Sequence, residues 1–102
     1  MDKTQVLVKV SKKLEKLIPK FLIYQTENLA ALKDAFAKID IKKIGEIGHI
    51  MKGAGGGYGF NEITNLGSKL ELAANDKNIP EIEKNLSDLN FFLKNLKVEF
   101  VE

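Results

Sequence analysis

The residues best suited to chemistry lie together between positions 48 and 60. This stretch contains His49, the only histidine of the chain, and six of its eight glycines. A free imidazole is mostly neutral at pH 7, so one ring nitrogen keeps a lone pair that can attack phosphorus without a separate base. Lys52 follows three residues later, one helical turn away, where its ammonium group would attract the oxygens of a phosphoryl group. Together the two side chains suit phosphoryl transfer.

An amphipathic helix is expected to carry His49. It runs from about Ile41 into the glycine cluster, and at about 100° per residue its apolar residues share one face. That face holds Ile41, Ile44, Ile47, Gly48, Met51 and Gly55. His49 falls outside this arc, so we expect its imidazole to be exposed. Its neighbours on the helix surface are Gly45, Lys52, Gly53 and Gly56.

Four of the glycines are explained by packing or by a turn. Each glycine inside a helix costs roughly 1 kcal/mol relative to alanine, so a compensating role is expected. Gly48 and Gly55 face the core, where a missing side chain lets a neighbouring helix approach closely. Gly57 and Gly59 are expected to form the turn after the helix by taking positive φ.

The outward-facing glycines, Gly45, Gly53 and Gly56, need a different explanation. They surround His49 on the side where no other part of the chain is expected to approach. A surface without side chains would let the backbone or a loop of another protein come close to the imidazole. We therefore predict that these three glycines form a docking surface for a partner protein.

The pattern around His49 resembles the signature of histidine phosphotransfer (HPt) domains. The residues that carry the likeness read H-x-M-K-G-A-G-x-x-Y-G-F at 49–60, with L-I-P-x-F-L at 17–22 and L-G-x-x-L-E at 66–71. The resemblance implies that His49 is the phosphorylated residue, that Lys52 stabilises the phosphoryl group and that Gly53 gives a receiver domain access. The chain departs from the family in the extra glycines of its loop and in its β-like terminal segments.

The same resemblance implies a function in two-component signalling. The chain would be a phosphorelay carrier that accepts a phosphoryl group on His49 and passes it to or from the aspartate of a response-regulator receiver domain. A sensor histidine kinase would be its other partner. The receiver would supply the Mg²⁺, so we expect no cofactor, no resident metal and no autonomous kinase activity. The alternative is a phosphorylation-independent helical adaptor that binds a receiver-like partner, but the presence of His49 with Lys52 favours the carrier.

Other chemistries fit the sequence poorly. The glycine run matches neither the dinucleotide-binding fingerprint nor the P-loop, and no βαβ pattern precedes it. Zinc normally takes several histidine, cysteine or carboxylate ligands, and Glu46 is the one suitable residue within a turn of His49. No paired general acid and base is visible, so an autonomous enzyme lacks support.

The elements that must position His49 are helical. Apolar spacing predicts a short helix from about Ser11 to Ile18, with Ser11 as its N-cap, and a long helix over about 19–38. The break between them is placed at Pro19, because proline is best tolerated in the first turn of a helix. Two further helices are expected at about 60–74 and 80–96, each with one apolar stripe.

The short connections between these helices favour antiparallel neighbours. The expected fold is therefore an all-α, antiparallel up-and-down four-helix bundle with a short N-terminal helix. The segments Val6 to Val10 and Val98 to Val101 are rich in β-branched and aromatic residues. We predict that these two segments pair as a small β-ribbon beside the bundle.

Length, composition and charge limit the number of domains, the classes of binding partner and the compartment. With 102 residues the chain is expected to be one domain, 1–102, and without cysteine it has neither disulfides nor a thiolate site. Sixteen basic and fourteen acidic residues give a net charge of +2, which provides no electrostatic footprint for nucleic acid. No apolar run approaches the roughly 20 residues that span a bilayer, and residues 1–4 do not begin a signal peptide. We expect a cytoplasmic monomer that binds neither nucleic acid nor membranes.

Overall fold

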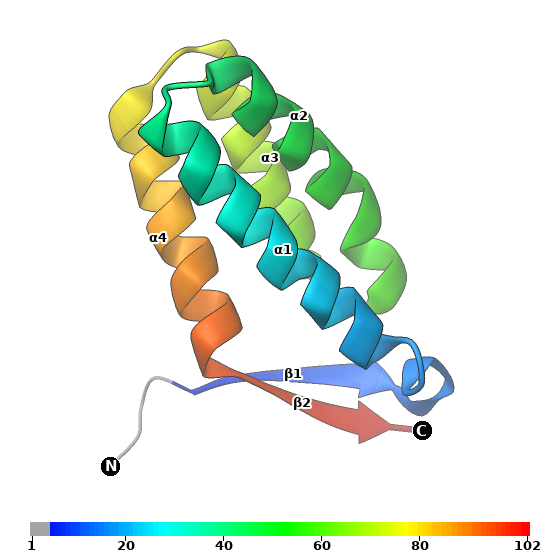
Figure 1. Ribbon diagram of the computed structural model, residues 1–102. Helices are drawn as coiled ribbons and strands as arrows, with labels where there is room; N and C mark the ends of the chain where they lie inside the picture. The colour runs from blue at the N-terminus through cyan, green and yellow to red at the C-terminus, as the bar shows by residue number, and fades with distance from the viewer. Residues whose placement is uncertain (1–4) are drawn as a thin grey trace.

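The computed structural model describes residues 5–102, which are mostly helical (Figure 1). Residues 1–4, for which we expect no signal peptide, lie outside the described part. Within it the α-helices are α1 (Ile18–Ala37), α2 (Ile41–Ala54), α3 (Asn61–Asn75) and α4 (Ile79–Asn95). The other elements are two strands, β1 (Val6–Ser11) and β2 (Leu96–Val101), and two 3₁₀ turns, η1 (Lys12–Leu14) and η2 (Gly56–Tyr58). None of the helices in residues 5–102 is both long and apolar enough to cross a membrane.

Local sequence signals explain where the main helices begin. The side chain of Asp40 accepts a hydrogen bond from the backbone N–H of Lys43 at the start of α2, and Asn78 does the same for Glu81 at the start of α4. Proline lies in the first turn of α1 and of α4, where its missing N–H costs no helical hydrogen bond. The four long helices predicted from the sequence are therefore confirmed to within one or two residues at each end.

The predicted short helix from Ser11 to Ile18 is wrong. Ser11 is the last residue of β1, and the segment that follows contains only the single 3₁₀ turn η1. Ser11 does act as a cap, because its hydroxyl accepts a hydrogen bond from the backbone N–H of Lys13. Between the end of β1 at Ser11 and the start of α1 at Ile18, only Lys12–Leu14 form a helical turn, and it is of the 3₁₀ type.

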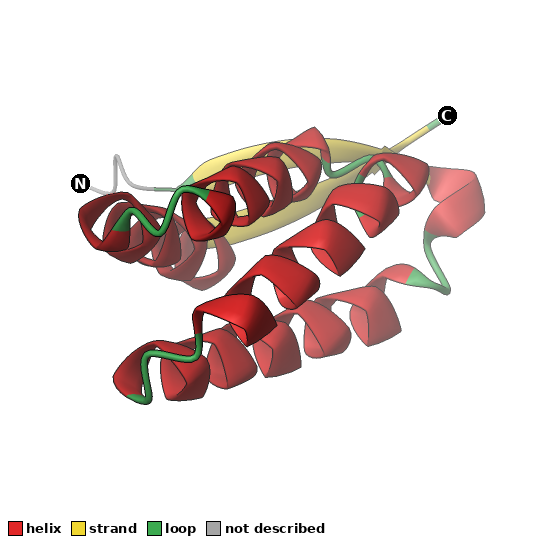
Figure 2. Ribbon diagram, turned by 90° about the horizontal axis from the view of Figure 1, so that it is seen from above, coloured by secondary structure: helices red, strands yellow, loops and turns green. Residues whose placement is uncertain are grey.

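The predicted pairing of the two terminal segments is confirmed. β1 and β2 form a parallel sheet, with Val6 opposite Leu96 and Ser11 opposite Val101. Alternate side chains of both strands pack against the core, whereas the residues between them are exposed. The strands run below the helices along one side, and β2 follows α4 directly (Figures 1 and 2).

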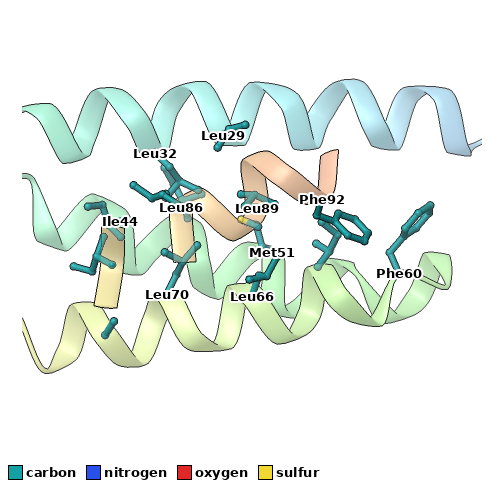
Figure 3. Close-up of a cluster of buried hydrophobic side chains, with 14 of the residues drawn as sticks. Leu29, Leu32, Ile44, Met51, Phe60, Leu66, Leu70, Leu86, Leu89 and Phe92 are labelled. Carbon is teal, nitrogen blue, oxygen red and sulfur yellow. The ribbon is translucent and has the colours of Figure 1, made fainter. Parts of the chain in front are cut away.

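One hydrophobic core lies between the helices. Figure 3 shows side chains from all four helices meeting there: Leu29, Leu32, Ile44, Met51, Leu66, Leu70, Leu86, Leu89 and Phe92. The apolar stripes predicted for α2 and α3 are buried, except that Ile41 is only partly buried. Phe36 of α1 and Leu93 of α4 are also partly buried. Two amides that were not predicted to be inside, Gln25 and Asn85, are also fully buried.

The backbones of α2 and α3 are in direct contact at Gly48 and Gly67. A Cβ atom built on Gly48 would lie 2.8 Å from the carbonyl oxygen of Gly67, and one built on Gly67 would lie 2.5 Å from the backbone nitrogen of Lys52. Gly55 is equally confined, since its Cβ would lie 2.6 Å from the backbone nitrogen of Thr64. The packing role predicted for Gly48 and Gly55 is therefore confirmed.

Replacing Gly67 by alanine should destabilise the protein. Alanine is the better helix former by about 1 kcal/mol, but its methyl group would push apart two backbones that cannot move independently. We expect a net loss of about 1–3 kcal/mol in the free energy of unfolding, measured by denaturant titration. Gly57→Ala is the control, because nothing lies within 4 Å of the added methyl group. Equal stability of the two variants would contradict this account of the helix contact.

Candidate functional site

The imidazole of His49 projects from the outer side of α2. Its side chain is 70% exposed, whereas Gly48 and Met51, on the inward face of the same helix, are buried. The exposure predicted from the helical spacing is thus confirmed. α2 is a rigid element packed along α3, so the position of the ring is set by a helix rather than by a loop.

A carboxylate from α3 holds this imidazole. The Nδ1 atom of His49 lies 2.9 Å from Oε2 of Glu71, whose side chain is only 27% exposed. The second carboxylate oxygen of Glu71, Oε1, lies 3.7 Å from Nζ of Lys52. One glutamate therefore contacts both residues that the sequence singled out for phosphoryl transfer.

The contact with Glu71 determines which nitrogen of His49 is available. A carboxylate only accepts hydrogen bonds, so in the neutral ring the proton resides on Nδ1 and is donated to Glu71. Nε2 is then the nitrogen with the lone pair, and Glu71 does not engage it. The same carboxylate would stabilise the positive charge that the ring gains when Nε2 forms a new bond. The pair thus provides an oriented nucleophile at the surface.

The position of Glu71 follows from the contact between α2 and α3. Glu71 is one turn beyond Gly67 on α3, and His49 is the residue after Gly48 on α2. A Cβ atom on Gly48 would lie 2.9 Å from the backbone nitrogen of Glu71, so the two backbones are in contact beside the imidazole. The two glycines therefore bring the carboxylate to the ring.

Glu71 was not singled out by the sequence analysis as a site residue. It appeared only as the last position of the L-G-x-x-L-E segment at 66–71. A usable signal is its place one turn after Gly67, because a glycine within an apolar stripe allows two helices to cross closely.

The three glycines predicted to form the docking surface differ in their surroundings. Gly53 is exposed, and nothing lies within 4 Å of a Cβ built there. Gly45 is partly buried, with the Cβ of Ala74 at 3.3 Å, so the expectation that no part of the chain approaches it is wrong. Gly56 belongs to η2 rather than to α2, because α2 ends at Ala54, and it is therefore not one of the helical neighbours of His49.

The predicted turn after α2 is present, but only one of its two glycines has the expected backbone. Gly59 takes a φ of 84°, which L side chains rarely adopt, and it ends the 3₁₀ turn η2. Gly57 lies inside that turn and does not take positive φ, so that part of the prediction is wrong. A 3₁₀ turn uses ordinary negative φ values, and a single left-handed residue is enough to end it.

An open groove adjoins His49. It has a volume of about 700 Å³ and lies between α2 and α3, with His49 and Glu71 among its lining residues. Gly45 and Ala74 also line it, and Lys42 and Lys77 contribute two positive charges. Among residues 5–102, no three His, Cys, Asp or Glu side chains gather closely enough to hold a metal ion.

Comparisons of the chain with protein-family models, with curated proteins and with solved structures find no match. The function must therefore be inferred from the motif around His49 and from the chemistry of the site, including the contact between His49 and Glu71.

The tautomer of His49 can be measured directly. When the ring of His49 is neutral, we expect the Nδ1–H tautomer to predominate, because Glu71 accepts that proton. Nitrogen-detected NMR of the imidazole measures the two tautomers. Glu71→Ala should shift the population toward the Nε2–H form, which free imidazole side chains prefer. Lys52→Gln is the control, since it leaves the His49–Glu71 contact in place. A wild-type ring protonated mainly on Nε2 would refute the assignment.

Proposed function

We propose that this chain is a histidine phosphotransfer domain that carries a phosphoryl group on Nε2 of His49. The observation that carries the proposal is the exposed imidazole whose Nδ1 atom is held by Glu71 at 2.9 Å. Orientation of one nitrogen leaves the other free to react, and phosphoryl transfer requires positioning above all else. The HPt-like motif around His49 and the nearby ammonium of Lys52 support the same assignment.

In the proposed reaction, the lone pair of Nε2 attacks the phosphorus of an aspartyl phosphate on a receiver domain. The N–P bond forms as the bond between phosphorus and the aspartate oxygen breaks, and the aspartate leaves as a carboxylate. The ring becomes positively charged while Nδ1 keeps its proton, and the carboxylate of Glu71 offsets that charge. Lys52, whose Nζ lies 3.7 Å from Oε1 of Glu71, would attract the phosphoryl oxygens as they move. Transfer in the opposite direction reverses each step.

This role makes the chain a carrier rather than a kinase. We infer that a sensor histidine kinase loads the relay and that a response-regulator receiver domain exchanges the phosphoryl group with His49. The receiver would bring the aspartate and Mg²⁺, in keeping with the absence of a nucleotide-binding motif in the sequence. We also infer that the helices form the antiparallel up-and-down bundle favoured by their short connections, with the cytoplasm as the site of action.

His49 is expected to be the sole phosphoacceptor. The wild-type chain, incubated with a panel of phosphorylated receiver domains, should take up an acid-labile, alkali-stable label, as phosphohistidine does. His49→Gln should take up none while retaining its helical circular dichroism, because the side chain is exposed. Neither protein should be labelled by ATP alone.

Label that persists in His49→Gln would exclude this role for His49. If no receiver labels the wild type, yet one binds it and His49→Gln equally well, the chain would instead be a phosphorylation-independent adaptor.

Gly53→Gln should separate docking from stability. Because the position is open, stability should be unchanged or rise by up to about 1 kcal/mol, since glutamine is the better helix former. Transfer from a receiver should slow by an order of magnitude or more, as displacing reacting atoms by about 1 Å can cost on the order of 10²-fold. Gly57→Gln is the matched control, with equal open space. Normal transfer rates in Gly53→Gln would exclude close docking at this position.

A further inference from the structure

Within the part of the chain that the structure describes, each strand of the β1–β2 sheet has one unpaired edge. Among residues 5–102 the sheet contains no third strand, and no element other than β1 forms a backbone hydrogen bond with β2. In Figure 1 no other described segment lies beyond β2 on the side away from β1. Such an edge presents a row of free N–H and C=O groups that can pair with a strand from another molecule.

The sequence of β2 is complementary to itself when two copies run antiparallel. With Val98 opposite Val98 of a second copy, Lys97 faces Glu99 of that copy and Glu99 faces its Lys97. On the other face, Leu96 lies opposite Phe100 of the second copy, an aliphatic–aromatic pair that stabilises sheets. Both charges of the strand therefore meet their opposites, and the core-facing residues Leu96, Val98 and Phe100 meet apolar residues.

Neighbouring registers lack this property. A shift that centres the pairing on Lys97 places two lysines opposite each other, and centring it on Glu99 does the same with two glutamates. A shift by a single position sets exposed side chains against core-facing ones, because side chains alternate between the faces. β1 offers no equivalent, since Lys9 is its only charged residue.

We propose that the chain dimerises through β2, which pairs antiparallel with β2 of a second copy about Val98. The result is a four-stranded sheet in the order β1–β2–β2–β1. Glu99 already lies opposite Lys9 of β1 in its own chain, so the exposed face would carry a row of alternating charges across the two copies. Within residues 5–102, neither Lys97 nor Glu99 forms an ion pair that would compete.

This inference is independent of the proposed function, and it differs from the sequence-based expectation of a monomer, which no observation tests. The paired edge belongs to β2, whereas His49 and Glu71 lie on α2 and α3, so dimerisation would not use the site residues. A contact made by one strand from each copy is small, and small interfaces are generally weak. The dimer should therefore be sought at protein concentrations up to about 1 mM.

The test uses charge reversal at the two complementary positions and sedimentation equilibrium of the full chain. The wild type should show a concentration-dependent dimer. Lys97→Glu and Glu99→Lys each turn both charge pairs from attractive to repulsive, and each should weaken dimerisation by about tenfold or more. An equimolar mixture of the two variants should form a heterodimer, and the double variant Lys97→Glu/Glu99→Lys should dimerise again. Circular dichroism confirms that each variant is folded.

Three results would overturn the proposal. One is a wild type that stays monomeric at every concentration tested, which would also be the result if the edge binds a strand of a different protein. Another is a dimer whose dissociation constant is unchanged in both single variants, because the interface would then lie elsewhere. The third is failure of the mixture and of the double variant to regain the dimer, which would exclude the antiparallel register about Val98.

Discussion

The contact between Gly48 and Gly67 is the constraint on which the geometry of the site depends. Two helices can bring their backbones together only where neither carries a side chain, and here the virtual Cβ positions lie within 3 Å of the opposing backbone. That closeness places α3 directly beside the face of α2 that adjoins His49. It also sets the depth of the groove between the two helices, because Gly45 rests on Ala74 one turn before Gly48.

The same contact explains how α2 can be stable although it contains several glycines. Each interior glycine lowers helix stability by about 1 kcal/mol relative to alanine, so α2 is a poor helix when considered alone. Its stability comes from tertiary packing: Ile44, Ile47 and Met51 are buried, and the glycines allow those side chains to reach the core from a short interhelical distance. The site is therefore supported by packing beneath it, and the imidazole is exposed on a helix whose opposite face is buried in the core.

The helices could be predicted because a 3.6-residue apolar repeat specifies a helix and its buried face, and the exposed position of His49 followed from that repeat. The partner of His49 could not be predicted in this way. Periodicity says which face of α3 is buried, but it does not say how far along α2 each residue of α3 lies. Glu71 could be assigned to His49 only once the crossing point at Gly67 was known. Gly45 was misjudged for the same reason, since Ala74 reaches it from α3.

Strand direction is set at a still longer range. The β-branched residues of the two end segments predicted strands, but whether they run parallel depends on the path of everything between them. All four helices together form the crossover connection that joins one parallel strand to the next. The short N-terminal helix was predicted wrongly because helical spacing alone could not show that Ser11 ends a strand paired with β2 and that only a 3₁₀ turn follows it.

The pairing of the first strand with the last has a consequence for the order of folding. Val6 and Leu96 are about 90 residues apart in the chain, whereas successive helices meet across loops of a few residues. Closing so long a loop costs conformational entropy that the helical contacts must first offset. The sheet should therefore assemble after the helices have docked, and it should be the first part to open. The hydrogen bonds between the strands would then form last, and they could be lost while the helical core stays folded.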